Sequence, residues 1–216
     1  MSVPIGDIFD GALYKEQKRN GFFDNPWAIS FMWNSDGAQL YKSSQVSIWP
    51  LYLVINELPY QMRFRQENII MGALWCGSVK PVANIMLGTL IEDFQLLATG
   101  VEMNTQPDGL QHIRGLLLCG TADTPARSMF LNMHSQSGSY CCAKCINPGL
   151  RVGGAQVFEY MPNPPVRTVE NVWEAATQLK NSSKKNDTHC QGIKGFTFLK
   201  TLTPDFVRGT AIDVMH

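Results

Sequence analysis

The chain has 216 residues, of which 44% are hydrophobic and 17% charged, a composition that excludes disorder and allows a sizeable core. Its 18 basic and 18 acidic residues give a formal net charge of zero, which argues against a self-sufficient nucleic-acid-binding domain but allows one that borrows affinity from another module. The longest apolar runs are too short to cross a bilayer, so no membrane segment is expected.

The N-terminus and the cysteines indicate a reducing, intracellular compartment. Acidic residues occur near the N-terminus, where a signal peptide would need a basic start and an apolar middle, so secretion is not expected. The six cysteines are therefore predicted to be thiols or metal ligands rather than disulfides.

Three strands are predicted in the first part of the chain. Residues 27–35 are rich in aromatic and β-branched side chains. Residues 47–58 form the second candidate, and Pro50 predicts that this strand starts after the proline or begins irregularly. Residues 68–77 are a third apolar run of strand length, for which a short buried helix is the alternative.

A helix, a strand and a second helix are predicted next. Apolar residues recur at steps of three and four over residues 84–100, which indicates one amphipathic helix ending at a glycine. After a polar connection, residues 113–120 are typical of a strand buried on both faces. The following helix is predicted to have Thr124 as its N-cap and Pro125 at its first position, and to run to about His134.

The remaining sequence is less regular. Residues 161–166 are expected to be extended, residues 168–180 show one apolar helical face, and residues 181–192 read as a polar loop. The chain ends at His216 in apolar sequence without a polar tail, which predicts that it is cut short.

The order strand, strand, strand, helix, strand predicts a mixed-sheet α/β fold of the ribonuclease-H-like type. Such a fold has a three-stranded antiparallel meander and a right-handed crossover that places the fourth strand parallel to the first. We expect an N-terminal extension over residues 1–26, the first part of the core over residues 27–136, and a cysteine-containing insertion over residues 137–216 that leaves the core incomplete at its C-terminus.

Two aspartates follow the first and fourth predicted strands. Because neighbouring strands lie about 4.8 Å apart, Asp36 and Asp123 are expected to converge. Two carboxylates there could share a pair of Mg²⁺ ions acting on a phosphodiester. Asp36 before Gly37 is also typical of a hairpin turn, and Asp123 of a helix cap, although Thr124 already serves as the predicted cap.

Cys142 and Cys145 have the spacing of half a tetrahedral zinc site. Cys141 could substitute for Cys142, and the alternatives are a redox dithiol or a pair of structural thiols. The missing zinc ligands would come from residues beyond the chain end or from His134, His189, Cys190 and His216.

Two further pairs of residues are candidates. Asp213 and His216 lie three residues apart and would share one face of a helix, where they could bind metal or cap the helix. Arg127 and Lys144 lie near the predicted carboxylates and are candidates for phosphate contacts, although isolated basic residues are usually solvated.

Five blocks of the sequence together resemble a known family. In order along the chain they resemble the transposases of CACTA (En/Spm-type) DNA transposons and the related transposase-domain proteins of animals. The likeness extends from residue 27 to residue 216, and the blocks are residues 33–59, 68–81, 119–149, 192–202 and 209–216.

The resemblance implies a ribonuclease-H-like catalytic core with a D, D, E/D metal triad that binds Mg²⁺ or Mn²⁺, cuts transposon ends and joins them to target DNA. Asp36 and Asp123 match its first two acids. Cys142 and Cys145 match its cysteine pair, for which a zinc ion is implied, and the D-x-x-H signature at Asp213 is implied to be structural or to support the metal site. DNA as partner, a homo-oligomer and a nuclear location are further implications.

The third acid of the family lies downstream of the D-x-x-H signature. We therefore expect that the chain is a fragment or a domesticated copy that does not catalyse strand transfer alone. The alternative is a catalytically inactive, zinc-stabilised module that binds DNA or protein. The acids within the chain are poor substitutes because nothing places them on a closing helix: Glu159, Glu170, Glu174, Asp187 and Asp205.

Overall fold

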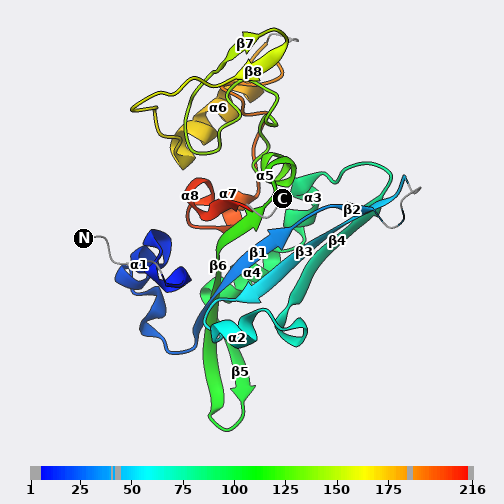
Figure 1. The fold of residues 1–216 in the computed structure, drawn as a ribbon. Helices are drawn as coiled ribbons and strands as arrows, with labels where there is room; N and C mark the ends of the chain where they lie inside the picture. The colour runs from blue at the N-terminus through cyan, green and yellow to red at the C-terminus, as the bar shows by residue number, and fades with distance from the viewer. Residues whose placement is uncertain (1–5, 40, 42–44, 184–186, 214–216) are drawn as a thin grey trace.

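A mixed sheet forms the centre of the molecule in the computed structural model, which describes residues 6–39, 41, 45–183 and 187–213 (Figure 1). β1 (Ala28–Ser35) pairs antiparallel with β3 (Ser47–Ile55), and β3 pairs antiparallel with β4 (Ile70–Gly77). On the other side of β1 lies β6 (Gly109–Ala122), parallel to it. The predicted α/β class with a mixed sheet is thus confirmed.

The strand β3 begins before its proline, so the predicted alternative of a start after Pro50 is wrong. It starts at Ser47, and Pro50 lies opposite Leu74 of β4. On its other side, β3 pairs with β1 up to Leu51 and with the short β2 (Ala38–Gln39) from Ile48. Pro50 falls in the gap between these two pairings, so its missing N–H removes no ladder hydrogen bond there.

The helix predicted over residues 84–100 is two helices, α3 (Ala83–Gly88) and α4 (Ile91–Thr99). The apolar spacing that suggested one helix is still used, since Leu87 and Leu90 are both buried. The break follows Gly88, a poor helix former, and the Thr89 hydroxyl donates to the carbonyl of Met86 at 2.7 Å. The chain therefore bends while its apolar side chains stay in the core.

The strand β6 is longer than the predicted 113–120. Its first half pairs antiparallel with β5 (Val101–Thr105), and the two strands form a ribbon that projects from the sheet (Figure 1). The predicted polar connection is therefore part of a hairpin. Its side chains are largely exposed, which is why the sequence lacks a buried-strand pattern there.

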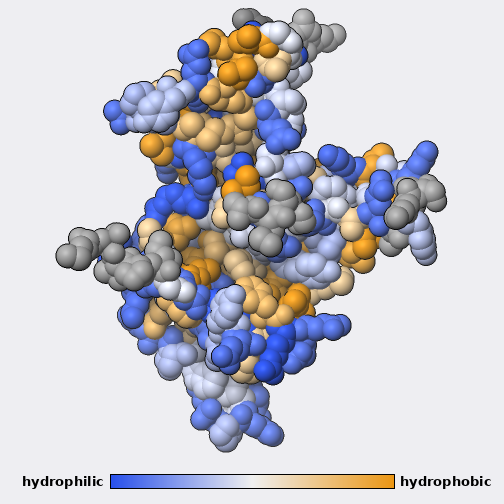
Figure 2. All heavy atoms as spheres, in the orientation of Figure 1, coloured by the Kyte–Doolittle hydropathy of each residue, from blue (hydrophilic) through white to orange (hydrophobic). Residues whose placement is uncertain are grey.

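The chain leaves the sheet after α5 (Thr124–Phe130) and forms an outer lobe, defined here as residues 146–183. The lobe contains the hairpin of β7 (Leu150–Val152) and β8 (Ala155–Val157) and the helix α6 (Val169–Asn181), near the predicted helix at 168–180. Figure 2 shows apolar side chains gathered at its outer end, over the β7–β8 hairpin.

The end of the predicted insertion returns to the sheet. α7 (Leu199–Leu202) packs against α4, α8 (Phe206–Gly209) packs near β6, and β9 (Thr210–Ile212) pairs parallel with β6. Residues 199–212 are thus part of the sheet domain rather than of the lobe.

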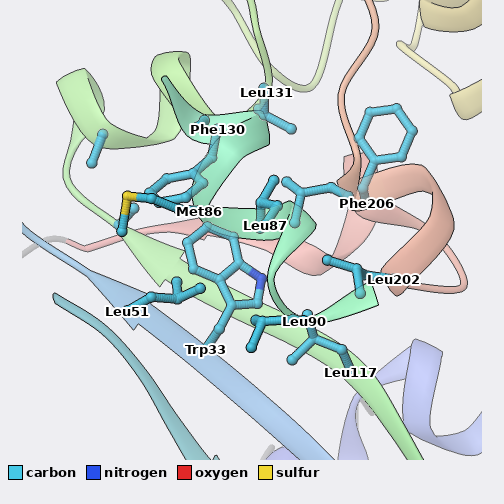
Figure 3. Close-up of a cluster of buried hydrophobic side chains, with 14 of the residues drawn as sticks. Trp33, Leu51, Met86, Leu87, Leu90, Leu117, Phe130, Leu131, Leu202 and Phe206 are labelled. Atoms are coloured by element: carbon cyan, nitrogen blue, oxygen red, sulfur yellow. The ribbon is translucent and has the colours of Figure 1, made fainter. Parts of the chain in front are cut away.

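One buried cluster joins the sheet to these helices (Figure 3). Trp33 of β1, only 1% exposed, lies at its centre and contacts the ring of Phe130 in α5. Burial of these side chains supplies most of the driving force for packing helices on the sheet. The other residues labelled in Figure 3 are Leu51, Met86, Leu87, Leu90, Leu117, Leu131, Leu202 and Phe206.

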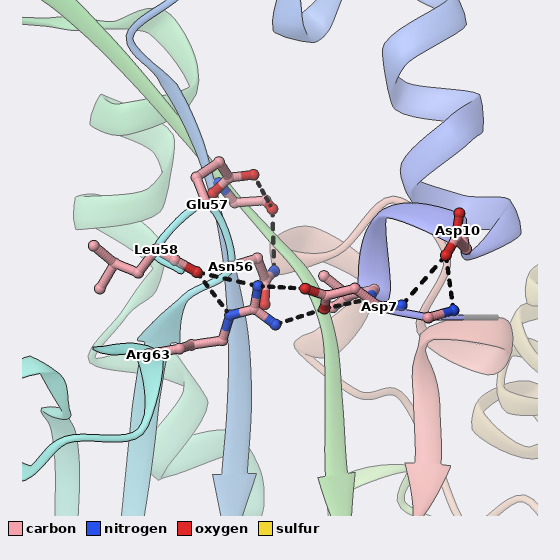
Figure 4. Close-up of polar contacts among 9 residues, drawn as sticks. Asp7, Asp10, Asn56, Glu57, Leu58 and Arg63 are labelled. Carbon is pink, nitrogen blue, oxygen red and sulfur yellow. Dashed lines mark hydrogen bonds and ion pairs between the residues drawn. The ribbon is translucent and has the colours of Figure 1, made fainter. Parts of the chain in front are cut away.

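The N-terminal segment is tied to the sheet by an ion pair. The buried guanidinium of Arg63 donates to both carboxylate oxygens of Asp7, at 2.7 and 3.0 Å (Figure 4). The N-terminal segment contains α1 (Ala12–Arg19) and single helical turns at Ile8–Asp10 and Phe22–Asp24. Arg63 ends the short helix α2 (Tyr60–Arg63), which is followed by a third single turn at Gln66–Asn68. Among the residues described, no helix has the length and apolarity that a membrane span requires.

Candidate active site

Two aspartates follow the ends of neighbouring parallel strands. Ser35, the last residue of β1, pairs with Ala122, the last residue of β6. Asp36 and Asp123 come next on their strands, and both are partly buried. The strand register therefore places the two residues side by side at one end of the sheet.

Asp36 does not lie in a hairpin turn. Ser35 pairs with Leu51 and Ala38 pairs with Ile48, so the chain continues past Asp36 along β3 in an unchanged register. Position 37 requires a glycine because of packing rather than a turn: a Cβ atom there would overlap the indole ring of Trp49. The turn interpretation of Asp36 is thus wrong.

Asp123 caps helix α5, and the prediction that Thr124 is the N-cap is wrong. Asp123 Oδ1 accepts a hydrogen bond from the Ala126 backbone N–H at 2.7 Å, and Thr124 is the first helical residue. An aspartate is a better cap than a threonine, and it reaches the N–H of the third helical residue. The helix ends at Phe130, earlier than the predicted His134.

Each of the two carboxylates accepts a hydrogen bond from a backbone N–H group. Asp36 Oδ1 accepts from the N–H of Gly37 at 2.7 Å. For Asp123, the second oxygen, Oδ2, has no hydrogen bond with any described residue. A carboxylate offers about four lone pairs, so the bond from the Ala126 N–H leaves Asp123 coordination capacity while it fixes the orientation of the group.

Asp213 lies at the same end of the sheet. Ile212, the last residue of β9, pairs with Ala122, and the N–H of Asp213 donates to the Ala122 carbonyl at 2.9 Å. Asp213 therefore follows a strand rather than lying in a helix, and three adjacent parallel strands each end at an aspartate. His216 lies outside the described residues.

The three aspartates form a row rather than one cluster. Among described residues there is no group of three or more His, Cys, Asp or Glu side chains close enough to hold one metal ion. The order of the strands accounts for this, because Asp36 and Asp213 are separated by the intervening strand β6, about 10 Å in all.

The cysteine pair lies in a tight turn that favours a thiolate. The backbone N–H groups of Lys144 and Cys145 point at Cys142 Sγ, at 3.4 and 3.3 Å. Burial opposes ionisation, but these N–H groups and the Cys145 thiol outweigh it and hold the pKa of Cys142 below its usual value. Burial and the neighbouring sulfur raise the pKa of Cys145 to about 11.

Cys141 is a weaker candidate than Cys142. Burial raises the pKa of the Cys141 thiol, so this group ionises less readily. Thiolates are the form that binds zinc, so Cys142 is a better candidate ligand than Cys141.

The histidines predicted as further zinc ligands lie beside each other. The rings of His134 and His189 have centroids 4.1 Å apart. His134 Nδ1 donates to the Ser139 carbonyl at 3.0 Å, and the Cys190 thiol donates to Gln178 at 3.3 Å. With no group of three among the described side chains, these residues do not complete the cysteine pair.

Of the two basic candidates, Lys144 has a structural role. Its ammonium donates to three carbonyls at the end of α8, those of Val207 at 2.5 Å, Arg208 at 3.2 Å and Thr210 at 2.9 Å. All three N–H donors are occupied, so a phosphate contact would have to displace them. The lysine thus connects the cysteine turn to the strand that ends at Asp213.

Arg167 is a buried residue that the sequence did not single out. It is 3% exposed, and its guanidinium donates to the carbonyls of Cys142 at 3.0 Å, Tyr140 at 3.2 Å and Gln191 at 3.2 Å. Burial lowers its pKa, and it has no ion pair with a described carboxylate. No local pattern marks this arginine, because its acceptors come from two other parts of the chain, residues 140–142 and Gln191.

Comparison with known protein families shows which family the chain belongs to. A family model described as Transposase family tnp2 matches residues 9–164. The chain belongs to this transposase family. The matched part of the transposase includes β1 to β8, Asp36, Asp123 and the cysteine pair. Asp213 lies outside it. A search of curated proteins gave no match.

Proposed function

We propose that this chain carries a catalytic core of the CACTA transposase type, which cuts DNA strands and joins them to target DNA with metal ions held by Asp36 and Asp123. The observation that carries the proposal is the pairing of Ser35 with Ala122, which aligns the two aspartates. The order β4, β3, β1, β6, β9, with β1 and β6 parallel, is the arrangement expected of a ribonuclease-H-like core and supports the assignment.

The donor set suits a hard cation. Carboxylate oxygens are the ligands that Mg²⁺ and Mn²⁺ prefer, and the Oδ2 atom of Asp123 has no bond to a described residue. When bound, such ions activate the attacking oxygen and stabilise the leaving oxygen of a phosphodiester. Asp36 and Asp123 would hold these ions. The hydrogen bonds from the N–H groups of Gly37 and Ala126 keep the two carboxylates in place.

The cysteine turn suits zinc. Two N–H groups already stabilise negative charge on Cys142 Sγ, as in a turn prepared for a bound thiolate. We propose that Cys142 and Cys145 supply two zinc ligands, and that His216 or another residue supplies the rest. The site would fix the lobe to the sheet domain.

A second function, a catalytically inactive module stabilised by zinc, rests on one observation. Asp123 already caps α5, and no group of three acidic side chains close enough to hold one metal ion is found among the described residues. In such a module the aspartates would be structural, while the cysteine turn would still bind zinc.

The proposed activity also implies a cellular location and an oligomeric state. The substrate would be chromosomal DNA, so we propose a nuclear location for the protein. Two ends of a DNA element must be brought together for transposition, which favours a homo-oligomer.

Metal binding tests the proposal. We expect the variants Asp36→Asn and Asp123→Asn to weaken Mn²⁺ binding by at least about tenfold, measured by titration calorimetry. Asparagine is chosen because it keeps the cap of α5, so Asp123→Asn should remain folded. Asp108→Asn, at the exposed tip of the β5–β6 ribbon, is the control and should bind Mn²⁺ like the unaltered chain.

The same titrations separate the two functions. If Asp36→Asn and Asp123→Asn bind Mn²⁺ as tightly as Asp108→Asn does, the catalytic proposal is wrong. Retained zinc binding that is lost in Cys142→Ser would then favour the inactive module.

A further inference from the structure

A groove of about 470 Å³, lined by both polar and apolar side chains, lies between α3 and α5. We call it the α3–α5 groove. Its walls come from three parts of the chain: residues 80–84 before and within α3, residues 125–135 in and after α5, and Lys194. None of the predicted site residues except His134 lines it.

Side-chain amides hold the three walls together. The carbonyl of Phe196 accepts hydrogen bonds from the amides of both Asn84 and Asn132, each at 3.0 Å. The backbone N–H of Lys194 donates to the Asn132 carbonyl at 2.9 Å. The groove is therefore a built feature, with Lys194 fixed next to α5.

The charge of the groove is positive. Lys80 and Lys194 are both exposed, and neither ammonium has an ion pair or hydrogen bond with a described residue. No aspartate or glutamate is among the lining residues. On a chain of zero formal net charge, this is a local concentration of positive charge, and a cleft strengthens the potential it produces.

The groove starts next to the aspartates. Pro125 and Ser128 of α5 line it, and the same helix is capped by Asp123. Figure 1 shows α3 and α5 beyond the end of the sheet toward which β1 and β6 run. A strand with one phosphate at Asp36 and Asp123 would have its next phosphates within reach of this groove.

We propose that the α3–α5 groove binds the sugar–phosphate backbone of one DNA strand beside the phosphate that is cut. This inference rests on the proposed function and adds the path of the strand. The ammonium groups of Lys80 and Lys194 contact phosphate oxygens, and the apolar lining at Val82 and Pro125 packs against sugars. Contacts to phosphate and sugar carry no sequence information, so the groove holds strands of any sequence.

The test is a double variant, Lys80→Gln with Lys194→Gln, in a fluorescence-anisotropy titration of a labelled single-stranded oligonucleotide at several salt concentrations. Each lost phosphate contact lowers the slope of log K against log salt by about 0.7, so we expect a decrease of about 1.4. At about 0.1 M salt this corresponds to a loss of affinity of roughly 10- to 30-fold.

The matched control is Lys18→Gln with Lys180→Gln, two exposed lysines outside the groove that change the net charge equally. We expect it to retain most of the affinity and the slope. The groove assignment is overturned if both double variants lose the same affinity, or if the groove variant binds like the unaltered chain.

Mn²⁺ binding distinguishes this inference from the proposed function. The groove variant should bind Mn²⁺ like the unaltered chain, because its lysines do not hold the metal. If the groove variant loses DNA affinity while Asp36→Asn and Asp123→Asn leave Mn²⁺ binding unchanged, the groove stands and the catalytic proposal falls. The opposite pattern removes the groove and keeps the catalytic proposal.

Discussion

At the scale of single residues, charged groups in this protein are held by carefully placed partners. Arg63 is 3% exposed and depends on Asp7 for its compensating charge, with two further bonds to the Leu58 carbonyl at 3.3 and 3.2 Å (Figure 4). Arg167 has three carbonyls instead of a carboxylate. In both cases the partner lies far away in the sequence or on another element, so the side chain ties two parts of the chain together.

Because of the Asp7–Arg63 pair, the free energy of unfolding is expected to fall as the solution becomes acidic. The hydrogen bond from Arg63 lowers the pKa of Asp7 and burial raises it. The hydrogen bond is the larger effect, so the pKa of Asp7 lies below its ordinary value. A lowered carboxyl pKa contributes stability above the unfolded-state pKa, and that contribution is lost as the pH falls below about 4. We expect Asp7→Asn to lose about 1–3 kcal/mol at neutral pH and to show a weaker decrease in acid.

Urea unfolding at a series of pH values measures this effect. The exposed Asp108→Asn variant serves as control and should keep the acid dependence of the unaltered chain. An unchanged acid dependence in Asp7→Asn would contradict the role given to the pair.

At the scale of elements, the sheet is shaped by close contacts between aromatic rings and glycines. Trp33 of β1 lies opposite Gly120 of β6, and a Cβ atom at position 120 would overlap the indole ring. Trp49 lies over Gly37 in the same way. Both glycines lie near the strand ends that precede the aspartates, so the fit of these rings also sets the site.

Gly120→Ala should therefore destabilise the protein by about 1–3 kcal/mol, because Trp33 is fully packed and must shift. Thermal unfolding measures the change. Gly88→Ala is the matched control: an added Cβ there meets only Phe198 at 3.5 Å, an ordinary contact, and alanine favours a helix. A Gly120→Ala variant as stable as Gly88→Ala would show that the ring adapts freely.

At the scale of the whole molecule, two basic side chains connect the lobe to the sheet domain through the cysteine turn: Arg167 of the lobe bonds the turn, and Lys144 bonds the turn to the sheet domain. Lys144 joins the cysteine turn to the end of α8, and Arg167 joins the chain before the lobe to the chain after it. These contacts place the cysteine turn near the start of β9. A zinc ion at the turn would add to the same connection.

Arg167→Lys should loosen this connection while the sheet stays intact, because an ammonium cannot reach three carbonyls arranged for a planar fork. We expect a loss of about 1–3 kcal/mol and faster amide exchange over residues 140–146 and 189–193. Hydrogen-exchange mass spectrometry measures it, with Arg151→Lys on the exposed β7 as control. Equal exchange in the two variants would contradict the anchoring role.

The sequence alone determined the features that depend on local patterns. Apolar runs marked β1, β3, β4 and the centre of β6, and helical spacing marked α6, because burial on one or two faces imposes a period that is visible within a short window. The positions of Asp36 and Asp123 just after two of these runs were also readable, since strand ends follow from the same patterns. Their catalytic role remains a proposal.

The tertiary structure decided everything that depends on register and distant contacts. The split of the helix at Gly88, the pairing of the polar residues 101–105 with β6, and the place of Asp213 beside Asp123 follow from partners far along the chain. The same holds for the α3–α5 groove, whose two lysines are far apart in sequence but line the same groove. The Phe196 carbonyl, which accepts hydrogen bonds from two asparagines, helps to hold its walls together. Long-range packing leaves no periodic signal, so no local reading of the sequence could have found them.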